Sequence, residues 1–220
     1  TYKILLQDPK TRFVGIHGLL KQKLQEEDFE TALNLATRAF ALKPKHLETQ
    51  DALLKLQAGQ KDWAGVRKTL NAKLNHGSLP RDVHRRRDGV FALSQARELH
   101  AVGELEASHV KAIEANKLTP GLVPAAILMA QGYLEKNKPK MASKTLRAAW
   151  SIEPHPELAA SFAAIVSNET PTERLDRFLT LTKLAPSHSE TKMVLAELNI
   201  AAGQFGQARL EMGDLASIDP

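Results

Sequence analysis

The chain has 220 residues, of which 43% are hydrophobic and only 5% aromatic, and its formal net charge is +5. A core must therefore be built mainly from alanine and leucine, which favour helices. The absence of cysteine excludes disulfides and thiolate metal sites. No run of 18 apolar residues occurs, so the sequence predicts no membrane-spanning helix within this segment.

Prolines recur at a nearly constant interval, and each follows a helix-like segment. The spacings between Pro120, Pro154, Pro186 and Pro220 are 34, 32 and 34 residues. A second series keeps the same phase and is expected to open the second helix of each unit: Phe29, Trp63, Leu105, Pro139, Pro171 and Phe205. A period near 34 residues built from two helices is typical of the tetratricopeptide repeat. The sequence therefore predicts an all-α fold, a right-handed α-solenoid of about six tetratricopeptide-like helix pairs, and favours binding over catalysis.

Six units are predicted within a single tetratricopeptide-repeat domain. Their approximate ranges are 11–44, 45–78, 79–120, 121–154, 155–186 and 187–220. In the first unit we expect helices near 11–26 and 28–42, with the small residues Ala32, Ala36 and Ala39 allowing close approach of the paired helix. Phe29 is expected to fill the gap beside the turn, and Trp63 takes the same place in the second unit.

The later units depart from the regular length in two places. The third unit has eight extra residues, which we expect to lengthen its first helix from Pro80 to Ala101. The fourth should hold helices near 121–136 and 139–152. In the fifth, the first helix should run from the Pro154–Pro156 turn, which His155 caps or shapes, to near Asn168, and Thr170 should open the second. The sixth should hold helices near 188–202 and 204–217.

The chain starts at Thr1, without a methionine, and stops at a repeat boundary. We therefore expect a fragment of a longer protein, with apolar surface exposed at both ends of the stack.

Three stretches are more specific than the generic repeat: 8–20, 118–128 and 148–159. They include Thr11-Arg12 with Gly15, and Trp150 with Pro154-His155-Pro156, which the repeat itself does not demand. Together they resemble the tetratricopeptide region of the HemY-type proteins of proteobacteria, over nearly the whole chain.

The resemblance implies a membrane-anchored bacterial protein. Two transmembrane helices would precede the repeat region, which would face the cytoplasm at the inner membrane, and the function would be linked to late haem biosynthesis. The resemblance supplies no catalytic residues, and the chain lacks Gly-x-Gly-x-x-Gly, so nothing supports flavin or nicotinamide binding. We predict that the protein is not an enzyme and that this fragment holds no cofactor, with haem or porphyrin binding left open.

A partner-binding surface is predicted on the first helices of the units, which line the concave side of such a stack. Counted from the start of each unit, the second, fifth and ninth positions of these helices are expected to be exposed on that side. The fifth position becomes apolar from Leu93 onward, and the ninth is basic in the first three units. The predicted partner-binding residues are Lys21, Lys55, Arg97, His17, Asp51 and Gln131. Such a groove could hold an amphipathic helix or an anionic tetrapyrrole, or it could be no more than a solvated face.

Two further features remain open. The run Arg81–Arg87 could meet an anionic lipid surface or a phosphate-rich partner, or be a solvated helix end neutralised by Asp82 and Asp88. It lacks neighbouring aromatic residues for stacking, so no nucleic-acid partner is predicted. No His-x-x-x-His pair or Cys-x-x-Cys-His sequence occurs, so no metal site is predicted, and His100 is the best candidate for a haem ligand.

The leading function is thus a scaffold for protein–protein interaction, with haem-biosynthetic enzymes as the partners that the resemblance implies. The alternatives are a haem or porphyrin carrier and a generic interaction module of the bacterial envelope.

Overall fold

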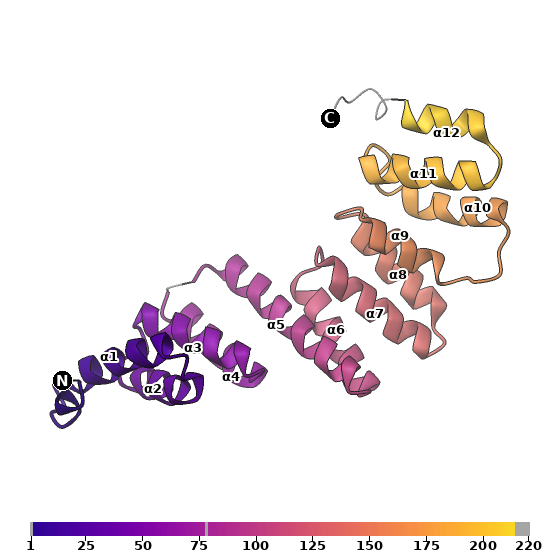
Figure 1. The fold of residues 1–220 in the computed structure, drawn as a ribbon. Helices are drawn as coiled ribbons and strands as arrows, with labels where there is room; N and C mark the ends of the chain where they lie inside the picture. Colours follow the sequence, from indigo (N-terminus) through magenta and orange to yellow (C-terminus); the bar gives the residue numbers. More distant parts are fainter. Residues whose placement is uncertain (1, 78, 214–220) are drawn as a thin grey trace. The chain divides into compact units, whose positions relative to one another are not determined.

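The computed structural model describes residues 2–77 and 79–213, and every regular element in them is a helix (Figure 1). In chain order these are the 3-10 helix η1 (Ile4–Leu6) and the α-helices α1 (Arg12–Gln25), α2 (Phe29–Leu42), α3 (Leu47–Gly59), α4 (Trp63–Asn75), α5 (Arg81–Ala101), α6 (Leu105–Leu118), α7 (Val123–Glu135), α8 (Pro139–Trp150), α9 (Pro156–Ala163), α10 (Pro171–Thr182), α11 (Ser189–Ala201) and α12 (Phe205–Met212). The predicted all-α helical-repeat fold is confirmed.

The repeat phase derived from the sequence matches these helices. Each of the six residues expected to open a second helix is the first residue of one: α2, α4, α6, α8, α10 and α12 begin with them. The extra length of the third unit lies in α5, which has 21 residues where α3 has 13. The handedness of the stack and its description as one domain stay predictions. Ser78, the marker Pro220 and the end of the last helix predicted near 217 lie outside the described residues.

The chain forms two compact units, residues 1–95 and 96–220, with the boundary inside α5. In the first unit, α1 packs on α2, α2 on α3 and α3 on α4. In the second, α7 packs on both α6 and α8, and α11 packs on both α10 and α12. Here α9 also contacts α7 and α11, so the first helices of successive pairs lie side by side, as the repeat requires.

Alanine at the helix crossings makes the close packing possible. Ala32, Ala36 and Ala39 have no exposed surface, as predicted. The second unit has a larger core, in which Trp150 is fully buried beside Phe162 and Leu146. Trp63, expected to take the place of Phe29 beside the turn, is half-buried in the first unit, with its ring 6.3 Å from that of Phe91.

Side-chain caps fix where the helices begin. Asp28 and Asp62 accept the backbone N–H of Thr31 and Gly65, at 3.2 Å and 2.9 Å. Three histidines cap first helices in the same way, namely His46, His155 and His188. The expectation that His155 caps its turn is therefore confirmed.

One helix is shorter than predicted. The first helix of the fifth unit ends at Ala163 and not near Asn168. Arg177 of α10 supplies the reason, because its guanidinium donates to the carbonyl oxygens of Phe162 at 2.7 Å and of Ala163 at 3.3 Å. Arg177 thus supplies hydrogen-bond donors to the last carbonyl oxygens of α9. Its positive charge also interacts favourably with the negative end of the helix dipole.

Three side chains lie otherwise than the sequence suggested. Leu93, placed on the exposed concave face, is buried at 5% exposure. Phe29 does not fill a gap, because 54% of its surface is exposed. Asp88 does not neutralise the arginine run, since it is buried and bound by Arg67 of α4 through two hydrogen bonds of 2.5 Å and 2.9 Å.

The described ends of the chain expose apolar side chains, as expected. Ile4 is 72% exposed and Leu210 is 75% exposed. Within the described residues, no helix combines the length and the apolar character that crossing a membrane requires.

Candidate functional site

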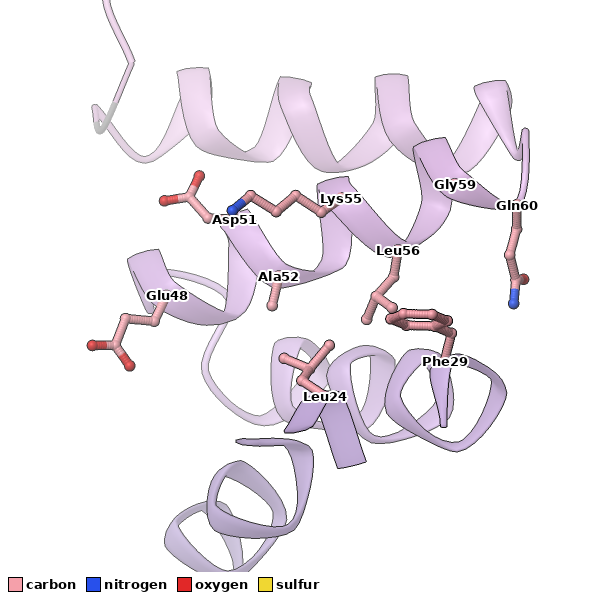
Figure 2. A pocket seen from close by; sticks show the side chains of 9 residues that line it. All are labelled: Leu24, Phe29, Glu48, Asp51, Ala52, Lys55, Leu56, Gly59 and Gln60. Atoms are coloured by element: carbon pink, nitrogen blue, oxygen red, sulfur yellow. The ribbon is translucent and has the colours of Figure 1, made fainter. Parts of the chain in front are cut away.

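A groove of approximately 710 Å³ opens in the first unit, between α3 and the junction of α1 with α2 (Figure 2). Its lining combines apolar side chains with charged and polar ones: Leu24, Phe29, Glu48, Asp51, Ala52, Lys55, Leu56, Gly59 and Gln60. A concave surface of this volume, mainly apolar with a few polar groups, is the usual form of a binding site.

The apolar part of the groove comes from two adjacent helix pairs. Leu24 belongs to the last turn of α1, Phe29 opens α2, and Leu56 lies on α3. Figure 2 shows the Leu56 side chain pointing toward the Phe29 ring. Phe29 reaches this position because Glu27 adopts a positive φ of 56° and Asp28 caps α2, so the turn directs the first helical side chain toward α3. The exposed ring is thus a groove wall and not a turn filler.

The charged part of the groove follows the repeat. Glu48, Asp51 and Lys55 are the second, fifth and ninth positions of the second unit, and all three line the groove. Figure 2 shows the Lys55 side chain lying along α3 with its Nζ on the side of Asp51. The structure thus places the predicted residues Asp51 and Lys55 in one groove. That they bind a partner stays a prediction.

The other predicted residues of the first unit converge on Glu48. Its Oε2 lies 3.1 Å from Nζ of Lys21 and 3.2 Å from Nε2 of His17. The hydrogen bond and the charge of Lys21 hold the pKa of the Glu48 carboxyl below its ordinary value. Asp51 is paired in turn with the buried ammonium group of Lys73. The surface expected to be basic is therefore of mixed charge in the first unit, where Glu48 pairs with Lys21 and Asp51 with Lys73.

His17 belongs to a group that the sequence did not reveal. His17, His46 and Glu48 offer one ligand atom each, and these atoms lie within 4.8 Å of one another. The two histidines are 29 residues apart in sequence, so a search for ligand pairs within one helix does not find them. The available signal was the repeat itself, since His17 and Glu48 both fall on the predicted concave face, at the fifth and second positions of neighbouring first helices.

The remaining predicted residues belong to the second unit. Arg97 on α5 and Gln131 on α7 are both exposed. His100 is exposed near the end of α5, with its Nε2 3.8 Å from Oε1 of Glu135, and in the described part of the chain it joins no group of three metal-ligating side chains. Its suggested role as a haem ligand stays a prediction.

A second groove, of approximately 450 Å³, lies among α9, α10 and α11. Its lining includes Glu190, Met193 and Glu197, the second, fifth and ninth positions of the sixth unit. The same three repeat positions therefore line a groove in each compact unit.

Comparison with known proteins leaves the specific family open. No family model matches the chain, and no curated protein matches it. Among solved structures, the chain is similar to a tetratricopeptide repeat protein from Parabacteroides merdae, with 12% identity, 94% of this chain and 80% of that chain covered, and a TM-score of 0.44. It is also similar to pilF from Pseudomonas aeruginosa, with 14% identity, coverage of 94% and 91%, and a TM-score of 0.42.

A third similar structure is YrrB, described as a tetratricopeptide repeat protein with an unusual peptide-binding site. Its identity is 11%, its coverage 87% of this chain and 95% of that chain, and its TM-score 0.43. Identities and TM-scores this low carry no information about the partner of this chain. The resemblance to HemY-type proteins stays a prediction.

Proposed function

We propose that the chain is a protein-binding module that captures an amphipathic helix of a partner protein in the groove of the first unit. The observation that carries this proposal is the composition of the groove, an apolar strip of Leu24, Phe29 and Leu56 bordered by Asp51 and Lys55. An amphipathic helix places apolar anchors at i, i+3 or i+4, and i+7, which suits a strip of this kind.

The exposed Phe29 ring is the expected anchor point. The Phe29 side chain is 54% exposed and so offers apolar surface that a partner can cover. Lys55 borders the same strip and is exposed, so it favours an acidic side chain on the polar face of the partner helix. Apolar burial thus supplies the affinity and the bordering charges set the orientation.

A tetrapyrrole carrier is the second candidate, because the groove volume suits a ligand of that size. The charges argue against it. Lys55 could pair with one propionate of a porphyrin, but the second would meet Glu48 or Asp51, and the lysine nearest to Glu48 is already engaged with it. Unfavourable like charge at the rim therefore favours a protein partner.

The resemblance to HemY-type proteins suggests the partner class and the location. On that basis the partners would be enzymes of late haem biosynthesis, gathered at the bacterial inner membrane by a repeat region facing the cytoplasm. The chain itself would carry out no catalysis.

Co-purification from the protein's own cells tests the groove. Phe29→Ala removes the apolar wall, and Lys55→Glu reverses the bordering charge. The matched controls are Leu105→Ala, at the same repeat position in the second unit, and Lys68→Glu, at an exposed lysine of α4 outside the groove. We expect both groove variants to lower recovery of the partner about tenfold, since an anchor side chain contributes roughly 1–2 kcal/mol or more. Equal recovery with groove and control variants would contradict the proposal.

A haem titration separates the two candidates. The wild-type chain is titrated with haem and with metal-free protoporphyrin and followed by Soret absorption. The module proposal expects no saturable one-to-one binding. Saturable binding that Lys55→Glu or His100→Ala abolishes would establish the carrier in its place.

A further inference from the structure

We propose that His17, His46 and Glu48 form a binding site for a divalent transition-metal ion, with Zn²⁺ as the best match. One ligand atom from each residue lies within 4.8 Å of the other two. In a tetrahedral zinc site with bonds of about 2.0–2.1 Å, ligand atoms lie about 3.3 Å apart. Nε2 of His17 and Oε2 of Glu48 are already 3.2 Å apart. The site therefore needs only small side-chain movements to close around an ion.

Two helices and an aromatic ring hold the ligands in place. His17 lies on α1, His46 caps α3, and Glu48 lies in the first turn of α3. Phe13 stacks on the His17 ring at 5.7 Å and meets the His46 ring edge-on at 4.9 Å. The two imidazoles meet each other edge-on, also at 4.9 Å. Both rings are thus oriented by contacts that exist without a metal, which lowers the entropic cost of binding.

The ligand types suit zinc and its neighbours. Imidazole nitrogen binds Zn²⁺, Ni²⁺ and Cu²⁺ well, and two histidines with one carboxylate is a known zinc ligand set that leaves a fourth position for water or another ligand. Each imidazole binds a metal in its neutral form, so binding is expected to weaken at acid pH.

His46 has a hydrogen-bond partner at one ring nitrogen, as metal-bound histidines usually do. Its Nδ1 lies 2.9 Å from Oγ1 of Thr49, and 3.3 Å from the backbone nitrogen that it caps. A histidine that binds a metal through Nε2 carries its proton on Nδ1 and donates it to an oxygen nearby. Oγ1 of Thr49 is such an acceptor. Metal binding would thus exchange the weaker capping bond for a donated bond to the Thr49 hydroxyl.

Lys21 is the competitor for this site. Its Nζ lies 3.1 Å from Oε2 of Glu48 and pairs with it. Because the Lys21 side chain is 60% exposed, it can move into solvent when a metal ion binds. Because Glu48 also lines the groove, the ion would replace a lysine pairing at the groove end and add positive charge there. The metal site does not depend on the proposed partner binding.

Direct metal titration of the whole chain, purified without a polyhistidine tag, tests the proposal. Zn²⁺ affinity is measured by competition with a chromophoric chelator, and Co²⁺ is used as a spectroscopic probe of four-coordinate geometry. We expect one Zn²⁺ per chain and visible Co²⁺ absorption of tetrahedral intensity. Each of three variants removes a ligand and should weaken Zn²⁺ binding at least about 100-fold: His17→Phe, His46→Asn and Glu48→Gln. Loss of a residue that only orients a ligand costs about 10–100-fold.

These variants are chosen to preserve the fold. Phenylalanine retains the stacking on Phe13, and asparagine is itself a good helix cap. His188→Asn, at a histidine cap in the second unit, is the matched control and should leave the affinity unchanged. Lys21→Met should tighten binding severalfold, which a merely structural role of these residues would not predict. Absence of stoichiometric binding, or equal affinity in wild type, His17→Phe and His46→Asn with circular dichroism unchanged, would overturn the proposal.

Discussion

At the scale of single residues, α6 and α7 approach each other closely at Gly132. A Cβ added to Gly132 would lie 2.1 Å from Nδ1 of His109. His109 is only 3% exposed and meets the Tyr133 ring edge-on at 4.6 Å, so it cannot turn away freely. Glycine is therefore required here by the neighbouring helix and not by its own backbone.

Gly132→Ala is expected to destabilise the chain by about 1–2 kcal/mol, because overpacking costs roughly 1–3 kcal/mol and alanine returns up to about 1 kcal/mol of helix propensity. Chemical denaturation followed by circular dichroism measures the change. Gly206→Ala in α12 is the control, since a Cβ there meets nothing within 4 Å, and it should be neutral or slightly stabilising. Equal stability of Gly132→Ala and wild type would show that His109 can move aside.

The sequence predicts the features that follow the repeat better than those set by contacts between distant residues. The 34-residue phase predicted the buried alanines and placed Asp51 and Lys55 on one surface, where both line the groove. It missed the pairing of Lys21 with Glu48 and the exposure of Phe29, because these depend on which neighbouring side chain each residue meets. The burial of Leu93 was missed because the lengthened α5 shifts the count of exposed positions.

At the scale of helices, the junction of α9 with α10 depends on one partly buried ion cluster. Arg177 pairs with Glu169, whose side chain is only 6% exposed, and Arg174 donates to the same carboxylate at 2.9 Å. Hydrogen bonding from Arg177, and then from Arg174, lowers the pKa of Glu169 below its ordinary value of 4.5. The guanidinium of Arg177 also lies over the Phe162 ring, 4.9 Å from its centroid.

Arg177→Met should therefore cost about 2 kcal/mol, because it leaves the partly buried Glu169 carboxylate with only Arg174 as a partner and removes the donor at the C-terminus of α9. The folded pKa of Glu169 is depressed, so the stability that this pair supplies is present above pH 4.5 and is lost as the pH falls through the lower, folded pKa. In thermal unfolding from pH 7 to pH 3, the difference in Tm between wild type and Arg177→Met should become smaller at acid pH. A Tm difference that stays constant over this range would assign the lost stability to packing alone.

Helix boundaries illustrate what sequence can and cannot supply at this scale. Where a boundary is set locally, as by the capping box of Thr170 and Glu173, the prediction was correct. Where it is set by a side chain from another helix, as Arg177 sets the end of α9, the local pattern predicted a helix that was too long.

At the scale of the whole molecule, the fold is a chain of neighbour contacts divided into two compact units. In such an arrangement a destabilising substitution lowers the stability mainly of its own repeat and the adjacent ones. Hydrogen exchange of Gly132→Ala should therefore speed up in α6, α7 and α8 and stay unchanged in α1 and α2. Uniformly faster exchange throughout the chain would instead indicate a single cooperative fold.

The central claim at this scale is that the groove of the first unit holds a partner protein. A photo-crosslinking amino acid at Gln60, on the groove, tests this most directly when the protein carrying it is expressed in its own cells, with the same amino acid at Lys68 as the control outside the groove. The account predicts a discrete protein adduct from position 60 that Phe29→Ala abolishes, and none from position 68. No adduct from position 60, or the same adduct from both positions, would contradict it.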